Sequence, residues 1–125
     1  MSAEDRGEHV YDLFMRGSRL LEAGDFSAAT IPLEKARRLE PDKTSIREAL
    51  GRAYFRSGRY GRAASEFSAV VDRSPANDYA HFCLGRSFEK LGDRRGARRH
   101  LSLAFGMRPD RTDYRLYRDR VRAAD

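Results

Sequence analysis

The stretch that decides the fold is ALGRAYFRSGRYGRA, residues 49–63. It predicts a helix, a turn centred on Gly58 and the start of a second helix, because a glycine supplies the left-handed conformation that ends many helices. Its Leu-Gly pair recurs 34 residues later as Leu84-Gly85, and a weaker copy of the stretch lies 34 residues earlier around Gly17. Prolines keep the same interval, at positions 41, 75 and 109. A period held by glycines and prolines together indicates a repeat of helical hairpins.

The rest of the chain divides into three such hairpins and a final helix. We expect repeats over residues 10–43, 44–77 and 78–111, a capping helix over 112–124, and a flexible tail over 1–8 ahead of a single domain at 9–125. The first helix is expected to start near His9. A glycine inside a helix costs about 1 kcal/mol relative to alanine. We therefore expect the mid-helix glycines to let alanines of the partner helix approach closely, the three pairs being Gly17 with Ala29, Gly51 with Ala63, and Gly85 with Ala97.

The same small and large residues recur at matching places in the second and third units. They are Leu50, Gly51, Tyr54, Ala63, Phe67 and Pro75 in one unit, and Leu84, Gly85, Phe88, Ala97, Ala104 and Pro109 in the other. The series resembles the tetratricopeptide repeat (TPR) family over residues 10–111, although the tryptophan of the family pattern is missing throughout. The resemblance implies an all-α solenoid of three helix-turn-helix repeats, wound as a right-handed superhelix and closed by a capping helix. Polar faces on the first and last helices predict a complete array of three repeats.

In the TPR family, inward-facing residues of the first helix of each repeat form a concave groove that binds peptides. The same helical phase in this chain gathers aromatic side chains with arginines spaced 34 residues apart. The candidate groove residues are Tyr11, Phe14, Met15, Ser18, Glu48, Arg52, Phe55, Arg56, Tyr79, Phe82, Arg86, Lys90, Tyr117 and Arg120. Such a surface suits an extended peptide with aromatic or apolar anchors and an acidic group or C-terminal carboxylate. The competing interpretation is that the rings pack between helices and the arginines pair with Glu48 and Glu89.

The sequence departs from the two-carboxylate clamp with which some TPR proteins hold chaperone tails. The lysine and asparagine positions of the clamp in the first two units are occupied by Phe14, Ser18 and Ala49. The lysine and arginine positions of the third unit are occupied by Tyr79 and Cys83. We therefore do not expect a chaperone tail of that kind as the ligand.

The net charge of +6 lies entirely in the last part of the chain. Residues 86–125 hold 12 Lys+Arg and 6 Asp+Glu, whereas residues 1–85 hold 13 of each. An Arg-rich C-terminal third can meet phosphates, so binding of nucleic acid or another polyanion is an alternative function. Acidic residues are interleaved and no nucleic-acid-binding motif is present, so nucleic acid is not the expected partner. A self-assembling structural module, with Phe105, Tyr114 and Tyr117 joining the copies of a homo-oligomer, is a further alternative.

No residue pattern in the chain points to an enzyme, a cofactor or a metal. His9, His81 and His100 fall on different predicted elements without metal-ligand spacing. Arg86, one turn from Cys83, can lower a thiol pKa, but we interpret Cys83 as a structural thiol. The lone cysteine, the polar N-terminus and the lack of a membrane-length apolar run lead us to expect a cytoplasmic bacterial protein without membrane association. The favoured function is a non-catalytic scaffold or adaptor that binds a partner protein or peptide in its concave groove.

Overall fold

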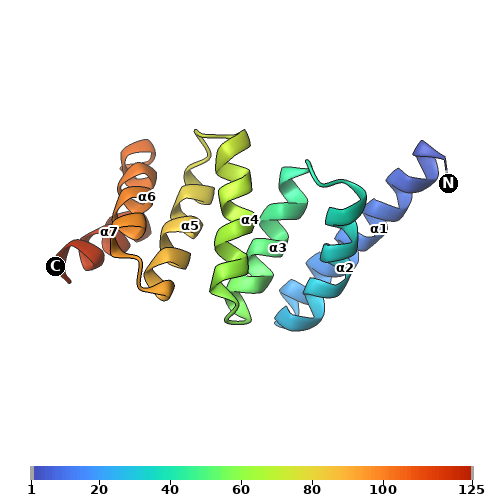
Figure 1. Cartoon of the computed structure of the whole chain (residues 1–125), viewed down its shortest axis with the longest axis horizontal. Coiled ribbons are helices and arrows are strands. Elements are labelled where there is room, and N and C mark those ends of the chain that lie inside the picture. The colour runs from blue at the N-terminus through green and yellow to red at the C-terminus, as the bar shows by residue number, and fades with distance from the viewer. Residues whose placement is uncertain (1, 125) are drawn as a thin grey trace.

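The computed structural model describes residues 2–124 and folds them into α-helices, with no strand in that range. The helices are α1 (Ala3–Glu22), α2 (Phe26–Leu39), α3 (Thr44–Arg56), α4 (Tyr60–Arg73), α5 (Asp78–Leu91), α6 (Arg94–Met107) and α7 (Thr112–Ala123). They stand side by side in one elongated row, with the two termini at opposite ends (Figure 1). The predicted all-α fold of three helical hairpins and a final helix is confirmed. Within the described range, no helix is long and apolar enough to cross a lipid bilayer.

The odd-numbered and even-numbered helices occupy different sides of the row. The backbones of α1 and α3, of α3 and α5, and of α5 and α7 approach one another closely, whereas in the described residues the backbones of α2 and α4, and of α4 and α6, do not. The odd-numbered helices are therefore crowded together on the inside of a curve, and the even-numbered helices are splayed on the outside. All of the predicted groove residues lie on odd-numbered helices, which places them on the concave side.

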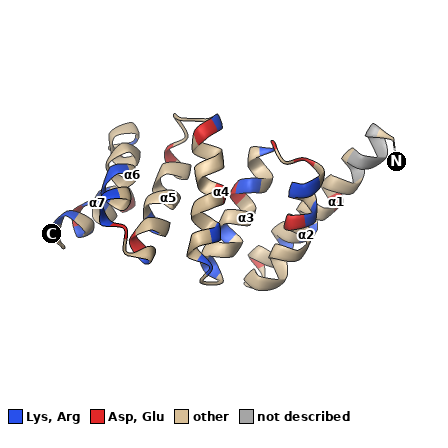
Figure 2. Ribbon diagram, in the orientation of Figure 1, with Lys and Arg blue, Asp and Glu red and all other residues tan. Residues whose placement is uncertain are grey.

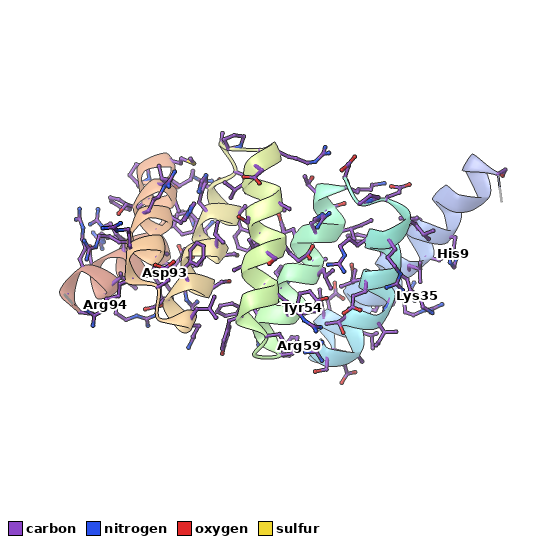
Figure 3. The ribbon with its side chains drawn as sticks, in the orientation of Figure 1. His9, Lys35, Tyr54, Arg59, Asp93 and Arg94 are labelled. Carbon is purple, nitrogen blue, oxygen red and sulfur yellow. The ribbon has the colours of Figure 1, made fainter. Side chains whose placement is uncertain are left out.

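Glycines end the first helix of each hairpin, as the sequence predicts. Gly24, Gly58 and Gly92 have φ angles of 82°, 81° and 82°, which is the left-handed conformation that favours glycine. Figure 3 shows Tyr54 and Arg59 at the turn from α3 to α4, where the Arg59 amide donates to the Tyr54 carbonyl at 2.8 Å. These turns make each pair of helices antiparallel.

The mid-helix glycines have a different packing partner from the one expected. A Cβ atom added to Gly51 would lie 2.9 Å from the ring of Phe67, and one added to Gly85 would lie 2.8 Å from Cγ of Leu101. The alanine partners were therefore wrongly assigned, because each glycine makes room for a large side chain of the second helix. Gly17 does the same for Leu33. The alanines are nevertheless fully buried in the same hairpin interfaces.

Helix α1 begins at Ala3, six residues before the predicted start at His9. The residues between these positions are good helix formers apart from Gly7, and none is proline, so helical backbone can continue through them. Most of the segment expected to be a tail is therefore helical. The flexibility of residues 1–8 and the domain boundary at residue 9 stay predictions.

One continuous core runs from α1 to α7 and includes the capping helix. Tyr114 of α7 is fully buried, its ring stacks on Phe82 with centroids 4.7 Å apart, and its hydroxyl donates to Asp78 at 2.7 Å. On the outer side, the buried carboxylate of Glu66 on α4 is shared by Arg37 of α2 and Arg47 of α3. These contacts fix the N-terminal end of α5 and join the first two repeats.

Candidate peptide-binding groove

An open cavity of about 240 Å³ lies on the concave side, between α3 and α5. Six of the predicted groove residues line it, three from each of these two helices. The full lining is Leu21, Arg52, Phe55, Arg56, Phe67, Tyr79, Phe82, Cys83 and Arg86. The structure thus brings together residues that are separated by up to one repeat period in the sequence.

Arg52 and Arg56 form the exposed rim of the cavity on α3. Neither side chain makes a hydrogen bond or an ion pair with a described residue, and the Arg56 guanidinium lies 4.4 Å from the ring centroid of Phe26. Burial raises the pKa of Glu48, and the nearby Arg52 charge opposes that rise. The competing expectation that Arg52 pairs directly with Glu48 is wrong, since no ion pair joins them. The rim therefore presents two guanidinium groups that lack a carboxylate.

Arg86 has a different environment, in the wall of the cavity. Its guanidinium lies between two rings, 5.2 Å from the centroid of Phe55 and 4.0 Å from that of Tyr117. Its Nε atom is buried without a hydrogen-bond partner and lies 3.7 Å from Oε1 of Glu89. Arg120 of α7 binds Glu89 directly, through hydrogen bonds of 3.0 and 2.6 Å. The expected pairing with Glu89 is therefore present for both arginines: Arg120 forms a hydrogen-bonded ion pair with it, and Arg86 forms a longer one without a hydrogen bond.

Aromatic rings and a buried thiol complete the cavity. Phe82 is only 8% exposed, and it packs against Tyr117 with ring centroids 5.4 Å apart, so its ring is a fixed wall. Burial raises the pKa of the Cys83 thiol to about 12, against the lowering effect of its hydrogen bond with Tyr79 and of the nearby arginines. Burial also raises the pKa of Tyr79. Both groups are therefore neutral at pH 7, which supports the structural interpretation of Cys83 over activation by Arg86.

The remaining predicted groove residues lie outside the cavity. Tyr11 on α1 is 63% exposed, and Phe14 is half-buried against the core. The other two residues on α1, Met15 and Ser18, are also half-buried, and Lys90 is exposed near the end of α5.

Two cavity residues escaped sequence reasoning. Leu21 follows the core spacing of α1, and Phe67 belongs to the second helix of its hairpin. Gly51 is the signal that could have found Phe67, because only a residue without a side chain lets that ring pass α3 and reach the cavity.

Several arginines of the C-terminal third pair with acids that neighbour them in sequence. Arg108 binds Asp110 at 2.9 and 3.0 Å, and Arg111 binds Asp113 at 2.7 and 3.0 Å. Arg118 of α7 donates from Nε and Nη2 to Oδ1 of the next residue, Asp119, at 3.0 and 2.7 Å. Figure 2 shows acidic positions beside the basic ones on this part of the row. Acidic side chains therefore interrupt the cationic surface of this segment.

Sequence reasoning also missed a pair of histidines between α5 and α6. The Nδ1 atoms of His81 and His100 lie 2.9 Å apart, and Nε2 of His81 lies 2.8 Å from the Pro75 carbonyl oxygen. A carbonyl only accepts, so His81 donates through Nε2 and its Nδ1 accepts from His100. Burial, followed by the charges of His81 and Arg99, lowers the pKa of His100 to about 4. No group of three or more potential metal ligands occurs in the described part of the chain.

Known proteins share both the sequence pattern and the fold. A tetratricopeptide repeat family model matches residues 14–78, just over half of the chain. The inactive TPR repeat-containing thioredoxin TTL3 of Arabidopsis thaliana is 28% identical over 109 residues, covering 87% of this chain and 16% of that protein. Superkiller complex protein 3 of Homo sapiens is 32% identical over 77 residues, covering 62% of this chain and 5% of that protein. The chain thus spans less than a fifth of the length of these relatives.

Solved structures match nearly the whole chain. The first TPR domain of Spaghetti (RPAP3), bound to the HSP90 peptide SRMEEVD, has a TM-score of 0.87 at 16% identity and covers 94% of this chain and 93% of that one. The TPR domain of Arabidopsis OM64 has a TM-score of 0.88 at 14% identity and covers 96% and 99%. The matched family model, the repeated hairpins and the shared fold lead to one conclusion: the chain belongs to the tetratricopeptide repeat family.

Proposed function

We propose that the protein is a non-catalytic interaction module that holds an extended segment of a partner protein in its concave groove. TPR proteins are in general interaction modules, and this chain belongs to that family. The observation that carries the proposal is the cavity between α3 and α5, with its aromatic walls and its carboxylate-free arginine rim. Its volume of about 240 Å³ falls below the roughly 300 Å³ of common small-molecule sites. An anchoring side chain of a peptide fits this space better than a cofactor does.

The chemistry of the cavity defines the segment that would bind. An apolar or aromatic side chain enters between Phe55 and Phe82, and an acidic group or C-terminal carboxylate of the partner reaches Arg52 and Arg56. The RPAP3 domain is bound to an HSP90 peptide, but the clamp residues for such a tail are missing from this chain. A chaperone tail is therefore not the proposed ligand. The proposal places the protein in the cytoplasm, where a single buried thiol stays reduced.

Charge reversal at the rim tests the proposal. Arg52→Glu is expected to lower the affinity for the captured partner about tenfold or more. The substitution removes the ion pair between Arg52 and the partner's carboxylate and adds repulsion between two carboxylates. The matched control is Arg95→Glu on α6, which changes the net charge equally outside the cavity. Capture assays with immobilised protein measure both. Equal capture by all three proteins, or equal losses in the two variants, would show that the groove is not the site.

Self-association is a second candidate, favoured by apolar side chains at the C-terminal end. Leu103 and Met107 of α6 are 39% and 37% exposed, and Leu116 of α7 is 61% exposed. Two of the residues predicted to join two copies are poorly placed to do so. Tyr114 is fully buried, and the Arg118 guanidinium covers the Phe105 ring at 4.2 Å from its centroid. Light scattering over a concentration series, with Leu116→Glu for comparison, measures whether this surface joins two copies.

A further inference from the structure

The groove contains a carboxylate of its own, Glu89, which lies between two arginines. Glu89 on α5 accepts hydrogen bonds from Nε and Nη2 of Arg120 on α7, at 3.0 and 2.6 Å. The oxygen that accepts from Nη2, Oε1, also lies 3.7 Å from Nε of Arg86, which is beyond hydrogen-bond distance. A movement of about 1 Å would convert this approach into a hydrogen bond. Glu89 therefore forms ion pairs with both arginines, but among these two it accepts hydrogen bonds from Arg120 alone.

Arg86 has an unmet requirement for an acceptor. Its side chain is only 20% exposed, and its buried Nε–H has no hydrogen-bond partner. Buried donors in native proteins are nearly always satisfied, so this one calls for an explanation. The rings of Phe55 and Tyr117 hold the guanidinium in place on both sides and keep it in the cavity wall. Arg86 is thus a cation held in place, and its nearest carboxylate, Glu89, lies at ion-pair distance without accepting a hydrogen bond from it.

We infer that Arg120 acts on the groove indirectly: by holding Glu89, it keeps that carboxylate beyond hydrogen-bond distance of Arg86 and leaves Arg86 with a donor for a carboxylate of the partner. Arg120 is then a positioning residue, and Glu89 is an internal competitor of an anionic ligand. This inference rests on the proposed function, because it concerns the affinity of the same groove. It changes the expected role of Arg120, which was predicted to line the groove and contact the ligand itself.

A double-mutant cycle with a charged probe and its neutral twin tests the inference. The probes are N-acetyl-phenylalanine and N-acetyl-phenylalaninamide, which share a ring and differ in the carboxylate. NMR titration measures their affinities for wild type, Arg120→Gln, Glu89→Gln and the double variant. We expect Arg120→Gln to weaken binding of the acid about threefold, because the released Glu89 moves onto Arg86, and exposed ion pairs are of that strength. Glu89→Gln should strengthen it by a similar factor.

The decisive value is the effect of Arg120→Gln when Glu89 is already Gln. If Arg120 acts only through Glu89, the double variant binds the acid as tightly as Glu89→Gln alone. The interaction energy between the two substitutions then equals the whole effect of Arg120→Gln on affinity for the acid. Equal weakening in both backgrounds would mean that Arg120 acts without Glu89, through the ligand itself or through the Tyr117 ring that lies 4.4 Å from its guanidinium, and would overturn the inference. Affinity for the amide should be the same in all four proteins. All affected side chains lie at the surface, so matching thermal midpoints confirm that each variant is folded.

A second readout follows Arg86 directly. In the probe-free Arg120→Gln variant, the Nε–H resonance of Arg86 should shift, because Oε1 of Glu89 becomes its acceptor; an unmoved resonance contradicts the inference.

Failure of the inference is separable from failure of the groove proposal. If both probes shift resonances of Phe55 and Phe82 but no variant alters affinity for the acid, only the role of Arg120 is refuted. If neither probe shifts them at millimolar concentration, both are refuted.

Discussion

Gly51 lies against the ring of Phe67, and this contact sets how closely α3 and α4 approach. The next residue, Arg52, points to the groove and makes no ion pair with a described residue. Neighbouring residues of one helix therefore have different roles, because successive side chains of a helix point about 100° apart. At the residue scale, packing is specified by the small residues and recognition by the large polar ones beside them.

Replacement of Gly51 by alanine should destabilise the fold even though alanine favours helix. The new methyl group would lie 2.9 Å from the Phe67 ring, and overpacking of a core typically costs about 1–3 kcal/mol. Gly61→Ala in α4 is the matched control, since nothing lies within 4 Å of the added atom, and it should be neutral or stabilising. Urea unfolding gives both free energies. Similar effects of the two substitutions would disprove this account of the hairpin contact.

At the element scale, α5 has distinct faces that carry distinct chemistry. One face presents Tyr79, Phe82 and Arg86 to the cavity, and another places Gly85 against Leu101 of α6. His81, one turn before Gly85 on that same face, is bonded to His100 of α6. The position of the groove wall therefore depends on how α5 is held by α6.

The histidine pair predicts a pH dependence of stability. The pKa of His100 is lowered from 6.5 to about 4 in the folded state, so the unfolded chain binds more protons between these values. Stability should be full above pH 6.5 and fall as the pH drops toward 4. The thermal midpoint of wild type should therefore decrease between pH 7 and about pH 5, where most carboxylates remain charged. His100→Gln should be less stable at pH 7 but flatter over that range; an equal slope in both proteins would contradict the assignment.

The Glu66 carboxylate predicts how strongly the first two repeats are joined. It is 3% exposed and neutralises Arg37 and Arg47 from two other helices. Loss of one member of a buried ionic group commonly costs about 3 kcal/mol or more, because the remaining charges lose their partner. Glu66→Gln should therefore lower the free energy of unfolding by roughly that amount. Asp72→Asn on the exposed side of α4 is the control and should cost little.

Much of the fold could be predicted from the sequence, because glycines and prolines mark local events. Gly58 ends a helix through its own backbone conformation, and no distant residue is needed to predict it. Pairings across 19 or 31 residues, such as His81 with His100 and Glu89 with Arg120, depend on tertiary neighbours and side-chain rotamers. The helical phase of the sequence predicts that Arg52 and Arg86 share one groove. It does not predict which of the two arginines forms an ion pair with a carboxylate of the chain.

At the scale of the whole molecule, the curvature of the row gives the groove its residues. Contacts between successive odd-numbered helices bring α3 and α5 together, and their side chains enclose the cavity without any contribution from a loop. The capping helix α7 adds Tyr117 beside Arg86 and Arg120 beside Glu89, so the last element is part of the recognition surface as well as of the core. The outer side carries the Glu66 ion pairs, which hold the repeats in register.

The most direct test of the central claim is site-specific photo-crosslinking on the two sides of the row. A benzophenone amino acid placed at Arg56 lies on the rim of the cavity, and one placed at Arg62 lies exposed on the outer side of α4. Irradiation with the captured partner should give a crosslink from position 56 and none from position 62. A crosslink from position 62 alone would contradict recognition through the concave groove.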